Sequence, residues 1–383
     1  MDGLLIDDQR SSDDGERYDL AAIRFALPMS SEVRWSDMLA VMVATDPAPL
    51  GRLLGLSGPL GDVVVRREVA VDPASQPDIV IERQGQRVAV IEVKVLAGLG
   101  TFQLERYAAA VPDAAVYVLV FPGRLVIDVG SGSGWRTLTW EALLEAYKAS
   151  TDSWVATCAT AWIEHLAGAL PAVDAATVWN DLMPGEDFVI ALRARMSWLH
   201  GQLAPPAPIR HGLVSSSAGV SWVARLYTEA AEKDYRILVE VEENLPVRDF
   251  PKYAGEGPRQ PRGPSIKVCL QQRNITTSAG YNWRYLAAMW PLMHAARSDW
   301  VPNPARPRAA HDRAGHQQIA TAGVPRYVGI GFGEAQAKID GACMFGARVQ
   351  LPPTITLGDL AQEVSSLYGL ISDLAKVVPP APQ

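Results

Sequence analysis

Two carboxylates and a lysine lie close together in the stretch QPDIVIERQGQRVAVIEVKV, which begins at Gln76. Asp78 precedes one run of β-branched residues, and Glu92 and Lys94 interrupt a second run. Side chains alternate between the two faces of a strand, so Glu92 and Lys94 share a face. Carboxylate oxygens are the ligands that Mg²⁺ prefers, and a bound cation lowers the pKa of a coordinated water. These residue types therefore predict a site for Mg²⁺ or Mn²⁺ that activates water near neutral pH.

The spacing between these residues fits a β-hairpin. Gly85, in the polar stretch RQGQR, is a natural turn residue between the two apolar runs. If the chain folds back about Gly85, Asp78 lies opposite Glu92, and a shift of one residue in the turn leaves them adjacent. Lys94 then lies two residues further along the same face. There its ammonium group either orients a water molecule or offsets negative charge that develops on phosphorus.

An alternative explains the charges without any chemistry. On a solvated hairpin, Glu92 and Lys94 pair across one face and contribute little to stability. The run VAVIEVKV argues against this alternative, because its apolar residues are typical of a strand that is largely buried. Charged side chains are rarely placed in such a strand without a partner or a task. We therefore favour a functional site.

The order of these residues resembles the signature of a nuclease superfamily. Gln-Pro-Asp78 followed by Glu92-x-Lys94 looks like the PD-(D/E)xK motif, whose members share the restriction-endonuclease-like fold. The helix expected next carries Gln103-x-x-x-Tyr107, which is similar to the QxxxY element of the RecB-type exonuclease branch. Gln103 and Tyr107 are four residues apart, so they share one face of that helix.

The resemblance covers about residues 30–130 and implies a role for each matching residue. In that superfamily, carboxylates at the positions of Asp78 and Glu92 hold the metal, and the lysine that matches Lys94 assists catalysis. The QxxxY pair supports the site and contacts DNA. The leading helix of the superfamily supplies a further acidic residue to the metal. Asp37, in the sequence WSDML, resembles this element, with aspartate where glutamate is more usual.

Hydrophobic periodicity predicts a mixed α/β core around the hairpin. A helix with an apolar face begins near Ser31 and ends at Asp46-Pro47. After it, the pattern predicts the succession β-β-β-α-β and then three helices. The expected elements are a strand at 63–71, the two hairpin strands, a helix at 102–110, strands at 115–121 and 124–129, and helices at 138–149, 153–169 and 174–203. The predicted fold is α/β, a restriction-endonuclease-like mixed sheet flanked by helices and followed by a second α+β domain.

Two stretches of unusual composition divide the chain. Residues 1–29 begin with a run rich in acidic groups, so we expect a flexible acidic tail. The proline-rich stretch 204–208 is the expected linker. Residues 30–204 then form the nuclease-like domain with a helical extension, and residues 209–383 form an α+β domain for nucleic-acid binding or assembly. The elements expected in this second domain are strands at 219–228, 235–243, 266–272, 326–332 and 342–349 and a helix at 282–296.

The charge is unevenly distributed along the chain. The net charge is −7 at pH 7, yet residues 248–313 hold 11 Lys or Arg against 4 Asp or Glu. Such a surplus can neutralise phosphates, and a solvated basic loop is the alternative. Aromatic residues that flank Arg273 and Arg284 either stack on bases or belong to the core. These aromatic residues are Tyr281, Trp283, Tyr285 and Trp290.

The sequence also predicts the cellular compartment of the protein. Every apolar stretch is broken by charge or proline before about 18 residues, so we expect no membrane span. The N-terminus is acidic where a secretory signal needs positive charge. Cys158, Cys269 and Cys343 are isolated, which is typical of a reducing compartment and argues against a disulfide framework or a zinc finger. A cytoplasmic protein is expected.

The last predicted helix, at 357–378, repeats its apolar residues every three and four positions, which is a heptad pattern. Its members are Leu357, Leu360, Val364, Leu367, Ile371, Leu374 and Val378. Three heptads are short, so this face either packs on its own domain or forms a homodimer. A homodimer would place two active sites near one duplex.

These observations predict a Mg²⁺-dependent nuclease that hydrolyses phosphodiester bonds in DNA. A place in bacterial phage defence or DNA processing is implied only by analogy with the superfamily. The alternatives are a catalytically inactive nucleic-acid-binding or assembly protein on the same fold, and a nuclease that acts on RNA. The QxxxY element favours cleavage from ends, whereas a dimer favours internal cuts.

Overall fold

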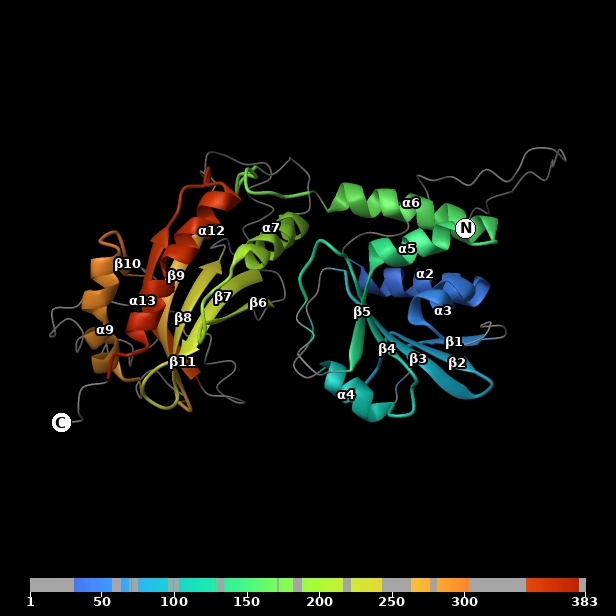
Figure 1. Cartoon of the computed structure of the whole chain (residues 1–383), viewed down its shortest axis with the longest axis horizontal. Coiled ribbons are helices and arrows are strands. Elements are labelled where there is room, and N and C mark those ends of the chain that lie inside the picture. Colours follow the sequence, from blue (N-terminus) through green and yellow to red (C-terminus); the bar gives the residue numbers. More distant parts are fainter. Residues whose placement is uncertain are drawn as a thin grey trace, which may run out of the picture. The chain divides into compact units, whose positions relative to one another are not determined.

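The three-dimensional structure of the chain is a computed structural model (Figure 1). It describes residues 31–56, 63–68, 70, 75–95, 99, 103–127, 129, 134–170, 172–181, 188–215, 222–242, 263–275, 281–302 and 342–378. The chain forms two compact units. Unit 1 comprises Met1–Leu96, Thr101–Gly123 and Ser131–Ala169, and unit 2 comprises Ala97–Gly100, Arg124–Gly130 and Leu170–Gln383.

Unit 1 is built on a mixed sheet. Five strands of the described ranges form it, in the order β1-β2-β3-β4-β5, with β1, β2 and β3 antiparallel and β3, β4 and β5 parallel. The strands are β1 (Val63–Arg67), β2 (Ile79–Arg83), β3 (Gln86–Val93), β4 (Tyr117–Phe121) and β5 (Trp135–Thr139). The helices are α2 (Glu32–Thr45), α3 (Ala48–Leu54), α4 (Gln103–Ala110), α5 (Trp140–Lys148) and α6 (Ser153–Ala169). The predicted mixed α/β architecture is confirmed.

Helices cover both faces of this sheet. In Figure 1, α4 lies on one side, whereas α2, α3 and α5 lie on the other and α6 packs on α5. Trp35 of α2 packs on Trp140 of α5, with their ring centroids 4.9 Å apart. On the other side, the indole N–H of Trp135 donates to the carbonyl of Leu104 in α4 at 3.0 Å. Because β3 lies between these layers, its sequence is a nearly continuous apolar run.

The hairpin between β2 and β3 has a two-residue turn. Gln84 and Gly85 form it, with φ angles of 52° and 77°, and Arg83 pairs with Gln86 on either side. Two successive positive φ angles are the mark of a type I′ turn, in which glycine is favoured because it lacks a Cβ. The predicted turn at Gly85 is confirmed.

A β-bulge then changes the register of the hairpin. It leaves Val88 of β3 unpaired, and beyond it Ile79 pairs with Ile91. Continuing this register by one residue places Asp78 opposite Glu92, which is the predicted pairing. Without the extra residue, Asp78 would oppose Ile91 and its side chain would point to the other face of the sheet. The pairing therefore depends on the bulge as well as on the turn.

Unit 2 contains an antiparallel sheet with helices on one face. Six strands of the described ranges form it, in the order β10-β11-β9-β8-β7-β6. They are β6 (Arg210–Ser215), β7 (Trp222–Glu229), β8 (Tyr235–Glu242), β9 (Ser265–Arg273), β10 (Val301–Pro302) and β11 (Ala342–Gln350). The helices are α7 (Phe188–Gln202), α9 (Trp283–Ala296), α12 (Leu357–Ser366) and α13 (Tyr368–Leu374). All four helices share one core with alternate strand residues such as Leu226, Val239 and Phe345. The opposite face of the sheet has no helix on it in the described part of the chain.

The boundary between the units lies near Leu170 and not at the predicted linker, 204–208. α7 packs on β6 and β7, and its Arg193 donates to the carbonyl of Val126 at 2.7 Å. The last helix of the extension assigned to the first domain, α7, therefore belongs to the second sheet, whereas α5 and α6 stay in unit 1. The helix predicted at 174–203 is also shorter than expected, because residues 172–181 form turns and extended segments. Proline marks a local break, but it does not show which sheet the preceding helix covers.

Several predicted elements differ from the structure. Residues 124–127, part of the strand predicted at 124–129, form no strand. Instead β5 occupies positions that the sequence assigned partly to the helix at 138–149. The predictions for the strand at 326–332 and the acidic tail at 1–29 lie outside the described residues. Neither α3 nor β6 was predicted, because both are short and lack a clear apolar period.

The heptad pattern at 357–378 is divided between α12 and α13. Its first six residues are buried in the core of unit 2, whereas Val378 is 70% exposed. The pattern therefore serves packing on its own sheet, and a homodimer through this face has no exposed apolar seam to use.

The aromatic residues near Arg284 also belong to the core. Tyr281, Trp283 and Tyr285 are at most 4% exposed. Tyr281 and Trp283 both pack on Phe345 of β11, with ring centroids 4.6 and 4.4 Å from it. These three rings are not available to stack on bases.

Helix length bears on the membrane prediction. The longest helix of the described ranges, α6, has 17 residues. None of the described helices is long and apolar enough to cross a membrane.

Candidate metal centre

Three of the residues predicted to act together lie on one face of the sheet in unit 1. Asp78 precedes β2, and its Oδ2 accepts a hydrogen bond from the backbone N–H of Val93 at 2.7 Å. Glu92 and Lys94 are only 2% and 7% exposed. The Nζ of Lys94 lies 2.7 Å from Oε1 of Glu92. The hairpin thus brings two carboxylates and a lysine together in a buried position.

α4 adds two polar side chains to this cluster. The Nε2 of Gln103 donates to Oε1 of Glu92 at 2.6 Å and to the hydroxyl of Tyr107 at 3.0 Å. Residues four apart lie on one helical face, so α4 directs both side chains toward β3. Gln103 and Lys94 together fix the orientation of the Glu92 carboxylate. Its other oxygen, Oε2, is buried and has no hydrogen-bond partner among the described residues.

A third carboxylate, Glu32, joins the cluster from the first residue of α2. Its Oε1 accepts a hydrogen bond from the backbone N–H of Val95 at 2.8 Å, and its Oε2 lies 3.7 Å from Nζ of Lys94. Sequence reasoning missed Glu32. The available signal was its place in the first turn of the helix before the sheet, where a negative charge also interacts favourably with the helix dipole.

Asp37, the residue predicted to supply this third carboxylate, lies elsewhere. It follows Glu32 by five residues, which is a rotation of about 140° around the helix axis. Its side chain is 55% exposed and forms an ion pair with Arg67 of β1. Within the described ranges it makes no hydrogen bond to Asp78 or Glu92. The geometry favours Glu32 over Asp37 as the acidic residue of the leading helix.

Arg67 holds the backbone beside the cluster. Its Nε donates to the carbonyl of Asp78 at 3.3 Å, and its Nη2 donates to Oε1 of Glu68 at 3.2 Å. With the ion pair to Asp37, these contacts fix the end of β1 against the residue that precedes β2. Arg67 therefore supports the position of Asp78.

Burial shifts the pKa values of the clustered groups. It raises the pKa of Glu92 from 4.5 to about 7, with Lys94 opposing the rise and Asp78 adding to it. Burial also raises the pKa of Asp78, although the hydrogen bond from Val93 acts in the other direction. For Lys94, burial lowers the pKa, but attraction to Glu92 and Glu32 outweighs it and the pKa rises. Lys94 therefore stays charged, and three acidic side chains, Glu92, Glu32 and Asp78, lie around this single cation.

The donor set fits a hard divalent cation. Mg²⁺ is commonly held by one or two carboxylates, with water and phosphate oxygens completing its coordination. Asp78 and Glu92 can supply those carboxylates, and Oε2 of Glu92 is free of other partners in the described part of the chain. Across the same ranges, no three His, Cys, Asp or Glu side chains form a ready-made metal cage. Asp78 and Glu92 are therefore the residues of this cluster that could hold Mg²⁺ or Mn²⁺.

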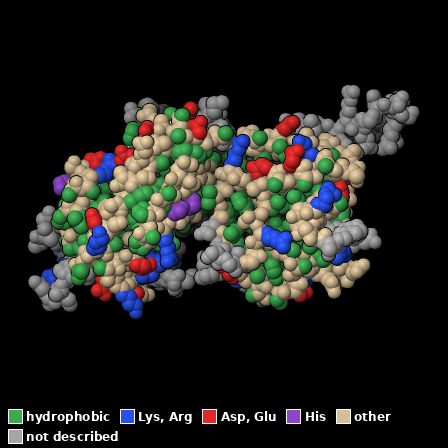
Figure 2. Space-filling model, viewed as in Figure 1, with side chains coloured by type: hydrophobic (Ala, Val, Ile, Leu, Met, Phe, Trp, Pro, Cys, Tyr) green, Lys and Arg blue, Asp and Glu red, His purple; other side chains and the backbone are tan. Residues whose placement is uncertain are grey.

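The predicted basic surplus is not visible as a single patch. On the face drawn in Figure 2, Lys and Arg side chains lie scattered among Asp and Glu. Of the stretch 248–313, the structure describes only 263–275 and 281–302. Most of the cations that gave the surplus therefore lie outside the described residues.

No protein-family model, curated protein or solved structure matches the chain. Its function is therefore inferred from the geometry of the hairpin, α2 and α4.

Proposed function

We propose that the chain is a Mg²⁺-dependent nuclease that hydrolyses phosphodiester bonds in DNA, with its active site on the β2–β3 hairpin. The observation that carries the proposal is the buried cluster of Asp78, Glu92 and Lys94 on one face of a strand pair. Glu32, from the leading helix, adds the acidic residue that the superfamily places there. The succession α2, α3, β1, β2, β3, α4, β4 around a mixed sheet supports a restriction-endonuclease-like fold for unit 1.

Each side chain of the cluster has a distinct task in this proposal. Asp78 and Glu92 hold the cation, which when bound supplies a Lewis acid and a water of lowered pKa. Lys94 keeps a positive charge 2.7 Å from Glu92, where it offsets charge that develops on the scissile phosphate. Gln103 fixes the Glu92 carboxylate from the side of α4. Glu32 holds the lysine from the opposite direction.

The burial of these charges is the strongest argument against a purely structural role. A buried ion pair rarely stabilises a fold more than well-packed apolar residues of similar volume. Here Glu92 lies in the central strand of the sheet and Lys94 follows that strand, and Glu32 and Asp78 add further negative charge beside them. Such an arrangement is costly for folding alone, and a catalytic site accounts for it.

Incubation of the full chain with DNA and a divalent cation tests the proposal. We expect Mg²⁺ or Mn²⁺ to support cleavage and EDTA to abolish it. Asp78→Asn and Glu92→Gln should each reduce the cleavage rate by at least roughly 100-fold. At saturating DNA, Glu240→Gln is the matched control, because Glu240 is an equally buried glutamate on a strand of unit 2.

The substrates decide the remaining alternatives. Cleavage of circular DNA shows internal cuts, whereas cleavage of linear DNA alone shows attack from ends. Cleavage of RNA but not DNA shows that the chain is a nuclease acting on RNA. Cleavage that survives in both Asp78→Asn and Glu92→Gln overturns the assignment of the site. Binding without cleavage under any metal supports an inactive protein on the same fold.

A further inference from the structure

The helix-free face of the sheet in unit 2 carries side chains in rows that run across the strands. The register of β7, β8, β9 and β11 aligns a central row of Tyr227, Leu238, Cys269 and Gly346, here called the apolar row. On one side of it lie Arg225, Glu240, Lys267 and Arg348. On the other side lie Glu229, Arg236, Gln271 and Met344. At the spacing of neighbouring strands, the apolar row is about 14 Å long. Leu238 and Cys269 in this row are only 2% and 5% exposed, whereas Tyr227 at its end is half-buried.

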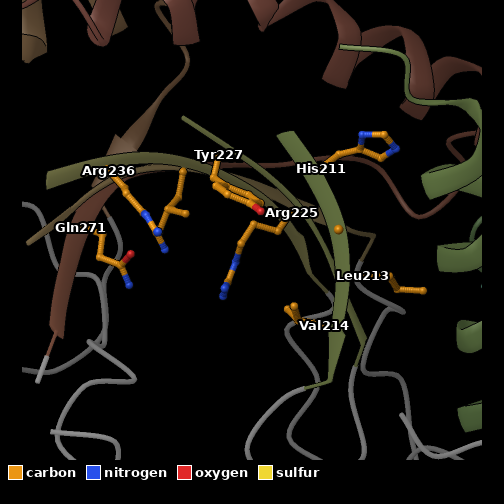
Figure 3. Close-up of a pocket in the computed structure, with 9 residues that line it drawn as sticks. His211, Leu213, Val214, Arg225, Tyr227, Arg236 and Gln271 are labelled. Atoms are coloured by element: carbon orange, nitrogen blue, oxygen red, sulfur yellow. The ribbon is translucent and has the colours of Figure 1, made fainter. Parts of the chain in front are cut away.

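A cavity of about 290 Å³ opens at one end of the apolar row. Tyr227 and Leu238 line it together with Arg225, Arg236 and Gln271. In Figure 3, the side chains of Arg225, Arg236 and Gln271 point to the same side of the sheet, and the ring of Tyr227 lies next to Arg225. The guanidinium of Arg236 is 5.6 Å from the centroid of that ring. The cavity thus presents an aromatic ring flanked by two cations.

This face also has a surplus of positive charge. Among the described strand residues, its cations are Arg210, Arg225, Arg236, Lys267, Arg273 and Arg348. Its acidic residues are Glu229, Glu240 and Glu242, and each of them is ion-paired. Six cations against three carboxylates leave a net positive surface that attracts an anionic ligand.

The arginines of the cavity can keep their ion pairs and still bind a phosphate. Arg236 uses its Nε to reach Glu229 at 2.7 Å. Arg225 reaches Glu240 through Nε at 2.8 Å and Nη2 at 2.6 Å. A guanidinium carries five N–H donors in a fixed plane, so these contacts use only part of each group. The carboxylates hold both arginines in place beside the ring of Tyr227.

We propose that the cavity at Tyr227 binds single-stranded nucleic acid, with one base stacked on Tyr227 and the backbone phosphates on Arg225 and Arg236. Aromatic rings within a positively charged groove are the chemistry that binds unpaired strands. A ring on the floor of a cavity suits an unpaired base better than a duplex, whose bases are stacked inside. The choice of a nucleic acid over another polyanion rests on the nuclease function proposed for unit 1.

Fluorescence anisotropy of a labelled single-stranded DNA and of its duplex tests this proposal, using the full chain in EDTA so that nothing is cleaved. We expect the single strand to bind more tightly than the duplex. Tyr227→Leu keeps bulk but removes the aromatic ring, so affinity should fall roughly ten-fold, whereas Tyr227→Phe should bind like the wild type. Arg236→Gln should weaken binding and lower the slope of log affinity against log salt by about 0.7.

Lys376→Gln is the matched control, because Lys376 is also ion-paired, at 3.0 Å to Asp373, but lies on α13. It should leave binding unchanged. Equal affinity in Tyr227→Leu, Arg236→Gln and the wild type overturns the proposal, as does a preference for duplex. Loss of binding in Tyr227→Leu supports this proposal even if the wild type cleaves nothing. Cleavage by the wild type with unaltered binding in Tyr227→Leu leaves the nuclease standing and removes this site.

Discussion

The two units both bury glutamates on strands, but they balance the charge in different ways. In unit 2, Glu240 and Glu242 are 1% and 8% exposed. Arg225 lies 2.6 Å from Glu240 across the strands, and Lys267 lies 2.5 Å from Glu242. Each acid therefore has its own cation, and the surrounding face is net positive.

In unit 1, one lysine serves several acids. Lys94 contacts both Glu92 and Glu32, and Asp78 faces the same cluster. An unpartnered oxygen alone does not distinguish the units, because Oε2 of Glu92 and Oε2 of Glu240 both lack a described partner. The difference is the balance of charge. A buried excess of carboxylates is relieved by protonation or by a cation from outside the chain, and the second is the basis of the metal site proposed for unit 1.

The largest expected effect separates two lysines that each pair with a buried glutamate. Lys94→Met should reduce the rate of DNA cleavage by roughly 100- to 1,000-fold, because the charge that offsets the developing phosphate charge is lost. Lys267→Met should destabilise unit 2 but leave cleavage per folded molecule unchanged at saturating DNA. Single-turnover assays in saturating Mg²⁺, normalised to the folded fraction by circular dichroism, measure both. Similar losses of cleavage in Lys94→Met and Lys267→Met would contradict the proposed difference between units 1 and 2.

The second prediction concerns stability against pH in EDTA. The pKa of Glu92 is about 7 in the folded chain and about 4.5 when exposed, so the folded state keeps a proton that the unfolded state loses. The stability contributed by Glu92 is fully present below about pH 4.5 and is lost as the pH rises through 7. The free energy of unfolding should fall by about 3 kcal/mol over this window, and Glu92→Gln should remove that fall.

Hydrogen exchange of the β3 amides measures this effect. Wild type and Glu92→Gln are compared at the same pH, so the intrinsic pH dependence of exchange cancels. Protection in β3 should be greater in the variant at pH 8 and similar in the two proteins at pH 4.5. An identical pH dependence in both proteins would show that Glu92 is not held protonated by its surroundings.

A smaller effect distinguishes two acids of one helix. Glu32→Gln should slow cleavage roughly ten-fold, because Glu32 positions Lys94 and the backbone at Val95. Asp37→Asn should change the rate by less than about two-fold, since Asp37 is exposed and pairs with Arg67. Cleavage assays on the two variants in parallel decide between them. A larger loss in Asp37→Asn would restore the assignment that the sequence motif suggested.

The parts of the fold that follow from local pattern were predictable. β3 is an apolar run interrupted by Glu92, and Gln103 and Tyr107 are spaced for one helical face, so both elements were correctly placed. The pairing of Asp78 with Glu92 was predicted from the turn alone. The structure reaches it through a two-residue turn and the bulge at Val88, which no sequence signal indicated.

The features that depend on tertiary contacts were not predictable. Glu32 and Asp37 both lie beside the apolar face of α2, and the rotation of that helix against the sheet decides which of them reaches Lys94. The proline-rich stretch at 204–208 is a genuine break after α7. Yet α7 belongs to unit 2, because its apolar side chains fit the second sheet. Neither the helix rotation nor the sheet that α7 covers can be read from local periodicity.

The binding of Mn²⁺ to the full chain, measured by calorimetric titration, tests the central claim most directly. We expect the wild type to bind Mn²⁺ at a site that is lost in Asp78→Asn and in Glu92→Gln. The site should be kept in Lys94→Met, because this change removes a cation that competes with Mn²⁺. It should also be kept in Glu240→Gln, because Glu240 lies in unit 2. Unchanged binding in both Asp78→Asn and Glu92→Gln would contradict the claim that the excess carboxylates of unit 1 form a metal centre.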